Sequence, residues 1–117
     1  MAKLERKLRG NFSEFLKYID ERITEGSISS SYEDGSDAVI QEARVAVRIY
    51  ERYSMFGGNR VSLNITVVGE EDRLFISGIT SGGSQAVFFK INTIGEETFL
   101  YKLEDAVEDY IKKTSMT

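Results

Sequence analysis

Two Gly-Gly pairs, Gly57-Gly58 and Gly82-Gly83, interrupt stretches in which apolar and polar residues alternate. Alternation with a period of two is typical of a strand with one buried face, and paired glycines between such strands favour hairpin turns. Alternate turns of a meander fall at alternate ends of the sheet, so we expect these two turns at the same end. The feature predicts an antiparallel sheet, which the rest of the chain must cover.

Strands are expected wherever the alternation continues for several residues between polar breaks. It is most regular in the segments on either side of Gly57-Gly58, whereas the segment before Gly82-Gly83 is apolar on both faces, as a central strand is. The expected strands are 3–9, 28–33, 44–52, 60–69, 73–80 and 86–91, and the expected polar turns are 34–37 and 69–72. For 3–9 a helical turn is the alternative, because Leu4 and Leu8 are also four residues apart.

Two segments have the spacing of amphipathic helices. Asn11 with Glu14 forms a capping box for a helix over about 12–25, which Gly26 ends. A second helix begins near Glu96 and closes at Lys112 and Lys113. Two helices on one face of the sheet give an α+β two-layer sandwich, with an antiparallel sheet of about five to six strands in the order β-α-β-β-β-β-β-α. We expect residues 1–117 to form a single domain.

Histidine and cysteine are both absent from the 117 residues. This excludes disulfides, thiolate nucleophiles, histidine bases and histidine zinc sites. An oxygen-only cation site stays open, but no EF-hand loop is present. The many carboxylates fall in expected turns and on helix surfaces, where acids are solvated. We therefore assign no catalytic residue, no metal ligand and no cofactor, and a hydrolase independent of histidine and cysteine ranks last among the functions considered.

The net charge and the hydropathy of the chain limit the kinds of partner that it can bind. A net charge of −4 and a pI of about 4.9 argue against nucleic-acid binding. The apolar runs are too short to span a membrane, and the first residues lack the apolar core of a signal peptide. The expected location is the cytoplasm.

The end of the sheet that carries the Gly-Gly turns is one candidate site. Backbone amides of glycine turns can bind an anion, and an arginine beside them can add a bidentate contact. The alternative, that the glycines only satisfy turn geometry, stays open. The residues predicted to bind a small anionic or polar ligand are Tyr53, Asn59, Arg60, Ser81, Ser84 and Gln85.

The sheet face away from the helices is the second candidate. We expect it to carry Arg44, Arg48, Arg52, Asn64 and Thr66. Because arginine and tyrosine are enriched at interfaces, Arg48, Tyr50 and Arg52 are predicted to contact a second copy, forming a homodimer, or another protein. A solvated face with cross-strand charge pairs is the alternative. The favoured function is thus a non-catalytic ligand-binding module, and the second is an interaction module.

Three segments carry a resemblance to a known family: Tyr50–Ser54, Phe56–Asn64 and Ser81–Lys90. They resemble a family of small bacterial proteins of about this length that is described as a domain of unknown function. The resemblance covers nearly the whole chain and implies a bacterial cytosolic protein that stands alone as one domain. It implies no activity, ligand or site residue.

Overall fold

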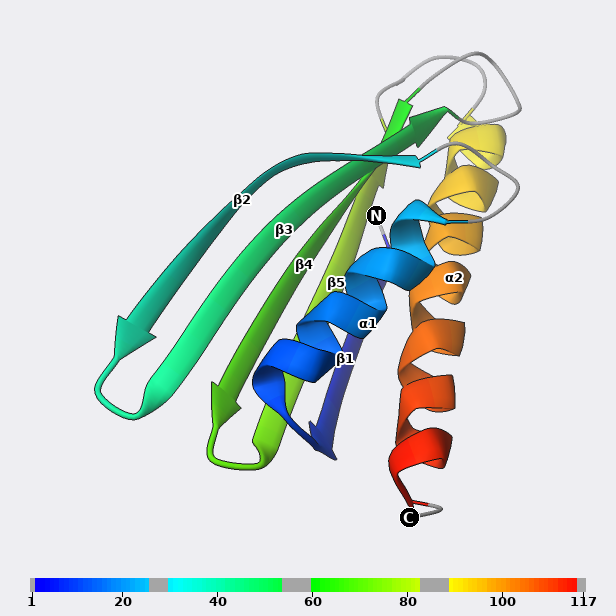
Figure 1. Cartoon of the computed structure of the whole chain (residues 1–117). Coiled ribbons are helices and arrows are strands. Elements are labelled where there is room, and N and C mark those ends of the chain that lie inside the picture. The colour runs from blue at the N-terminus through cyan, green and yellow to red at the C-terminus, as the bar shows by residue number, and fades with distance from the viewer. Residues whose placement is uncertain (1, 26–29, 54–59, 83–88, 116–117) are drawn as a thin grey trace.

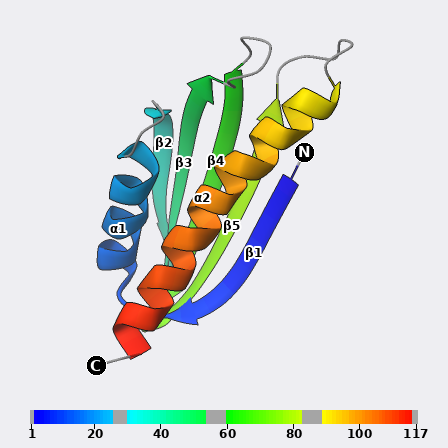
Figure 2. The same cartoon turned by 90° about the vertical axis from the view of Figure 1, so that its right-hand side faces the viewer.

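The computed structural model describes residues 2–25, 30–53, 60–82 and 89–115, with side chains from residue 97 onward in the last segment. It contains one five-stranded sheet and two helices, which lie on the same face of the sheet (Figures 1 and 2). The elements are β1 (Ala2–Arg9), α1 (Phe12–Thr24), β2 (Ser30–Ile40), β3 (Ala43–Tyr53), β4 (Arg60–Glu70), β5 (Arg73–Gly82) and α2 (Phe89–Ser115). The predicted α+β two-layer sandwich is confirmed.

All strand pairs are antiparallel, and the order across the sheet is β1-β5-β4-β3-β2. The first strand therefore pairs with the last strand, and β4 lies at the centre. Tyr53 pairs with Arg60, and Val61 pairs with Gly82, so β3, β4 and β5 meet at one end, as predicted for the Gly-Gly turns. Residues 54–59 and 83–88, which include most of those turns, lie outside the described residues.

Three predicted elements differ from the structure, one of them the second helix, which begins at Phe89 and not near Glu96. The turn predicted at 34–37 is wrong, because these residues continue β2, and the chain turns at Gln41 and Glu42 instead. Gln41 adopts the left-handed region with φ 55°, as Glu71 does in the next hairpin turn. Of the strand predicted at 86–91, residues 89–91 begin α2 and the others are not described.

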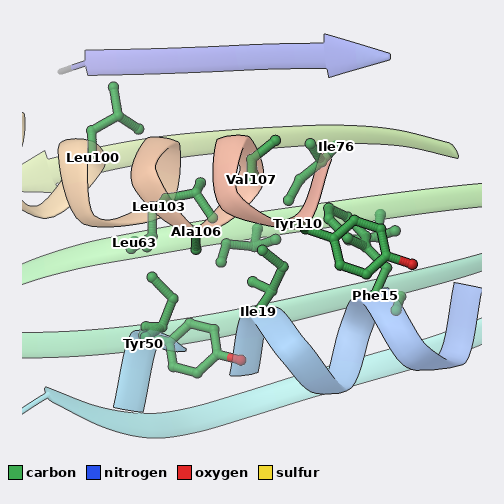
Figure 3. Packing of buried hydrophobic residues seen from close by; sticks show 14 of the residues in the cluster. Phe15, Ile19, Tyr50, Leu63, Ile76, Leu100, Leu103, Ala106, Val107 and Tyr110 are labelled. Carbon is green, nitrogen blue, oxygen red and sulfur yellow. The ribbon is translucent and has the colours of Figure 1, made fainter. Parts of the chain in front are cut away.

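The core lies between the sheet and the helices (Figure 3). Asn11 caps α1 as predicted, because its side-chain oxygen accepts a hydrogen bond from the backbone N–H of Glu14 at 2.9 Å. The predicted apolar face of α1 is buried through Phe12, Phe15, Ile19 and Ile23. The other large contributors are Tyr50, Leu63, Ile65, Ile76, Phe99, Leu103 and Tyr110.

The helices leave part of the covered face free. The β2–β3 hairpin extends past them (Figure 1), and nearly every β2 side chain is exposed. Gly78 of β5 is buried beneath Leu103, which allows α2 to approach the sheet closely. Within the described part of the chain, no helix has the combined length and apolarity that crossing a bilayer requires.

The predicted assignment of the sheet faces is wrong for β3. Arg48 and Arg52 pair with Ile65 and Val61, whose side chains point into the core, so this arginine row lies on the covered face. On this face, arginine side chains pack against aromatic rings of the helices in positions where apolar side chains are usual. The Cζ of Arg44, for example, lies 4.5 Å from the centre of the Phe12 ring. The face away from the helices, called the open face below, instead carries Val45, Val47 and Ile49.

Candidate anion site

Three residues predicted for the Gly-Gly end lie together at that end of the open face. Arg60 stacks on Tyr53, with its Cζ 5.1 Å from the ring centre, and its Nη1 contacts Oε1 of Glu51 at 2.8 Å. Ser81 donates a hydrogen bond to the hydroxyl of Ser62 at 3.5 Å. Because Glu51 already neutralises Arg60, this part of the predicted site holds no free cation.

The other predicted ligand-binding residues, Asn59, Ser84 and Gln85, lie outside the described residues. Their roles stay predictions.

The predicted interface residues are not on the open face, which corrects their placement. Tyr50 is fully buried and donates its hydroxyl hydrogen to Asp20 of α1 at 2.6 Å. Arg48 binds Asp37 at 2.9 Å and the carbonyls of Ser36 and Val47. Arg52 is only 7% exposed. These side chains hold β3 to the helices and to β2, so they are not available to a partner on the open face.

Arg52 is the unusual member of this row. Its guanidinium Cζ lies 4.8 Å from the centre of the ring of Phe99, a fully buried residue of α2. Among the described residues no acid forms an ion pair with it, and no described side chain or carbonyl accepts a hydrogen bond from it. Burial lowers the pKa of Arg52. A buried charge without a counter-charge is costly, and proteins normally pair it.

Lys102 brings a second cation to the same place. It lies three residues after Phe99 in α2, and its Nζ donates a hydrogen bond to the carbonyl of Ile23 at 2.9 Å. Ser30 donates to that carbonyl too, so the last turn of α1 is capped by side chains. Burial, followed by the nearby charges of Arg52 and Arg22, lowers the pKa of Lys102. Lys102 and Arg52 therefore repel each other across a partly desolvated space.

An open groove of about 380 Å³ adjoins Lys102, lined also by Arg22, Glu25 and Asp105. Arg22 binds Asp109 at 2.9 Å and the hydroxyl of Tyr18 at 2.6 Å. Burial opposes the charge of Arg22, but these contacts outweigh it and raise its pKa. Arg22 is thus neutralised, and the carboxylates of Glu25 and Asp105 line the outer part of the groove. Among the residues that the structure describes, Arg52 and Lys102 are the cations of this cluster that no carboxylate pairs.

The chemistry that these side chains offer is that of an anion site. Among the described residues there is no group of three or more carboxylates that could hold a metal ion. Two cations on neighbouring elements, one of them stacked and fixed by an aromatic ring, can bind a carboxylate, phosphate or sulfate group.

Sequence reasoning missed Arg22 and Lys102 because both lie on helices, where a cation usually faces water. The available signal was that Lys102 adjoins Leu103 on the apolar face of α2 and follows Phe99 by one helical turn.

Together, the fold and this cluster define a small two-layer α+β domain in which Arg52 and Lys102 lie close together beside a groove between its two helices. The profile of a family of unknown function, DUF6054, matches residues 1–111. The chain belongs to this family, which confirms the predicted resemblance to a domain of unknown function. No curated protein matches the chain.

Proposed function

We propose that this protein is a non-catalytic module that binds a small anion carrying a carboxylate, phosphate or sulfate group. The anion is held between Arg52 and Lys102, beside the groove at the C-terminal end of α1. The observation that carries the proposal is Arg52: a stacked, nine-tenths buried arginine for which the described residues supply no counter-charge.

The surroundings of Arg52 support this function. Phe99 fixes the guanidinium plane, so less conformational freedom is lost when an anion binds. The charge of Arg52 is close enough to contribute, after burial, to the lowered pKa of Lys102, and an anion between the two cations would relieve that repulsion. Glu25 and Asp105 would disfavour large, highly charged ligands, so a compact anion fits best.

A substitution that keeps the packing but removes the charge tests the proposal. Arg52→Met preserves an unbranched apolar stem against Phe99. We expect inorganic phosphate to raise the Tm of the wild-type protein by several degrees above chloride of equal ionic strength, and to leave the Tm of Arg52→Met unchanged. In chloride alone, Arg52→Met should be as stable as the wild type or more stable, because it removes a buried charge for which the described residues supply no counter-charge.

Arg44→Met is the matched control. Arg44 also stacks on a phenylalanine, but it is exposed and hydrogen-bonds Ser13, so this variant should keep the full phosphate response. The proposal is overturned if phosphate and sulfate leave the wild-type Tm unchanged while Arg52→Met lowers it, since Arg52 would then act only in the fold.

The cytoplasmic, bacterial setting that the resemblance implies is part of the proposal. The cysteine-free chain supports it, because such a chain needs no oxidising compartment to fold.

A further inference from the structure

The open face has a charge and polarity pattern that the anion site does not use. Its residues form rows across the sheet, each row running from β1 through β5, β4 and β3 to β2. The three central rows are Lys3-Ile79-Asn64-Ile49-Asp34, Glu5-Ser77-Thr66-Val47-Ser36 and Lys7-Phe75-Val68-Val45-Ala38.

Apolar side chains on this face lie on the two strands that flank β4. Val45, Val47 and Ile49 of β3 are half-buried, and on β5 Phe75 is half-buried while Ile79 is 39% exposed. Between them, β4 presents mainly small polar groups, such as Ser62, Asn64 and Thr66. No helix covers this side of the sheet (Figure 2). A broad exposed face in which apolar side chains alternate with polar ones from strand to strand is typical of an interaction surface.

The two edges of the open face have opposite charge. β1 contributes Lys3, Lys7 and Arg9 against Glu5, and Asp72 of the next hairpin turn binds Arg9 at 2.9 Å, so this edge keeps a small positive excess. β2 contributes only acids: Asp34, and Glu33 at the bulge, which accepts a hydrogen bond from Ser31. The face is therefore positive along one edge and negative along the other, with β4 halfway between them.

We propose that a second copy of this chain covers the open face, related to the first by a two-fold axis that lies between the two sheets and is inclined to β4 by about half of the roughly 30° at which packed sheets cross. Such an axis places β1 over the partner's β2, β5 over the partner's β3, and β4 over itself. Ile79 then meets the partner's Ile49, Phe75 meets the partner's Val45, and Lys3 on the basic edge meets the partner's Asp34 on the acidic edge. Asn64 and Thr66 meet their own counterparts, where amide and hydroxyl groups can pair.

Charge selects this axis over the alternative. A two-fold axis perpendicular to the strands would stack β1 on β1 and β2 on β2, opposing like charges along both edges. Two sheets packed face to face lie about 10 Å apart and cross at roughly 30°, so the rows match most closely near the axis. The face measures about 20 by 33 Å from strand spacing and rise, or roughly 650 Å². A stable interface buries about 800 Å² of accessible surface per partner. The flat area of the face is of this order, because side chains that stand out from the sheet add accessible surface to it.

Sedimentation velocity of the full chain at rising concentration is the first test. We expect a dimer at micromolar concentration, with a dissociation constant that Ile79→Lys raises about tenfold or more. Tyr101→Lys is the matched control, because Tyr101 is 57% exposed on the helix side and should not alter dimerisation. Circular dichroism confirms that each variant is folded. A monomer at high micromolar concentration, or a dimer that Ile79→Lys does not weaken, overturns the proposal.

A charge exchange tests the axis. Lys3→Glu and Asp34→Lys should each weaken the dimer, and the double variant should recover most of the loss. With the perpendicular axis, Lys3→Glu would instead tighten the dimer by relieving repulsion between the β1 edges, and this result would overturn the arrangement.

The absence of cysteine allows a direct check. Asn64→Cys should be cross-linked to its counterpart by a short bismaleimide, whereas Tyr101→Cys should not. Failure of Asn64→Cys to cross-link in a confirmed dimer contradicts an axis over β4. These results do not depend on phosphate, so failure of the dimer and failure of the anion site are separable.

Discussion

Tyr50 shows how one side chain can join the two layers of this protein. Its ring is fully buried, contacts the Tyr32 ring at a centroid distance of 5.8 Å, and carries a hydroxyl bonded to Asp20 of α1. Burial is the largest cause that raises the pKa of Tyr50 far above its ordinary value of 10.0, and the hydrogen bond and charge of Asp20 add to it. The neutral phenol is therefore the form that the native structure requires.

This requirement predicts a loss of stability in alkali. Above pH 10 or so, the unfolded chain releases the Tyr50 proton while the native state keeps it, so the native state binds more protons and the free energy of unfolding falls as pH rises. The slope for one group approaches about 1.4 kcal/mol per pH unit. Tyr50→Phe should be less stable than the wild type at pH 8 by about 1 kcal/mol, for the lost hydrogen bond, but should lose less stability between about pH 10 and 11.

Urea unfolding at several pH values measures this effect. Tyr101→Phe is the control, because its exposed hydroxyl is in water in both states, and it should keep the wild-type slope. An equal alkaline slope in Tyr50→Phe and the wild type would contradict the assignment.

At the scale of elements, sequence patterns succeeded where one face of an element is buried and failed where it is not. The α1 cap and its apolar positions follow a 3.6-residue period, and β4 strictly alternates buried and less buried residues, so both could be predicted. β2 is exposed on both faces, so no alternation marks it, and Asp34-Gly35-Ser36-Asp37 resembled a turn. In β3 stacked arginines occupy covered positions, so polarity indicated the wrong face.

The anion site could not be predicted for a related reason. It depends on residues from β3, α1 and α2 that only tertiary packing brings together, and neither Arg22 nor Lys102 breaks a local pattern. The end of the sheet at which Tyr53, Arg60 and Ser81 meet was predictable, because strand connectivity alone fixes it.

The contact between β5 and α2 gives a prediction at this scale. A methyl group added at Gly78 would collide with a methyl carbon of Leu103, which is itself fully buried. Gly78→Ala should therefore destabilise the protein by about 1–3 kcal/mol, as overpacking of a core does. Ser77→Ala, on the open face of the same strand, should cost less. Chemical denaturation measures both, and a Gly78→Ala variant as stable as Ser77→Ala would show that α2 can move away freely.

Over the whole molecule, stability should be uneven. α2 packs over β4, β5 and β1, and α1 contacts β2 as well as β4, but β2 lies at an edge, is exposed on both faces and extends beyond the helical layer (Figure 1). Segments with few buried contacts open at low free-energy cost. The edge strand β2 should therefore detach locally while β3, which buries Ala46 and Tyr50, stays folded with the rest.

Hydrogen exchange followed by mass spectrometry tests this gradient. At a concentration low enough to keep the chain monomeric, peptides from β2 should exchange much faster than peptides from β4. If the backbone amides of β2 exchange as slowly as those of β4 at this concentration, β2 does not detach independently.

The pairing of β1 with β5 has a consequence for synthesis on the ribosome. Leu8 of β1 pairs with Leu74 of β5, which lies 66 residues later in the chain. At about 5–20 residues per second, the first strand waits roughly 3–13 s for its neighbour to be made. During that time the alternating leucines and cations of β1 have no neighbouring strand to pair with. The first of the five strands to be translated is therefore among the last to join the sheet. A nascent chain arrested before β5 should thus expose a basic, amphipathic segment to chaperones and to the ribosome surface.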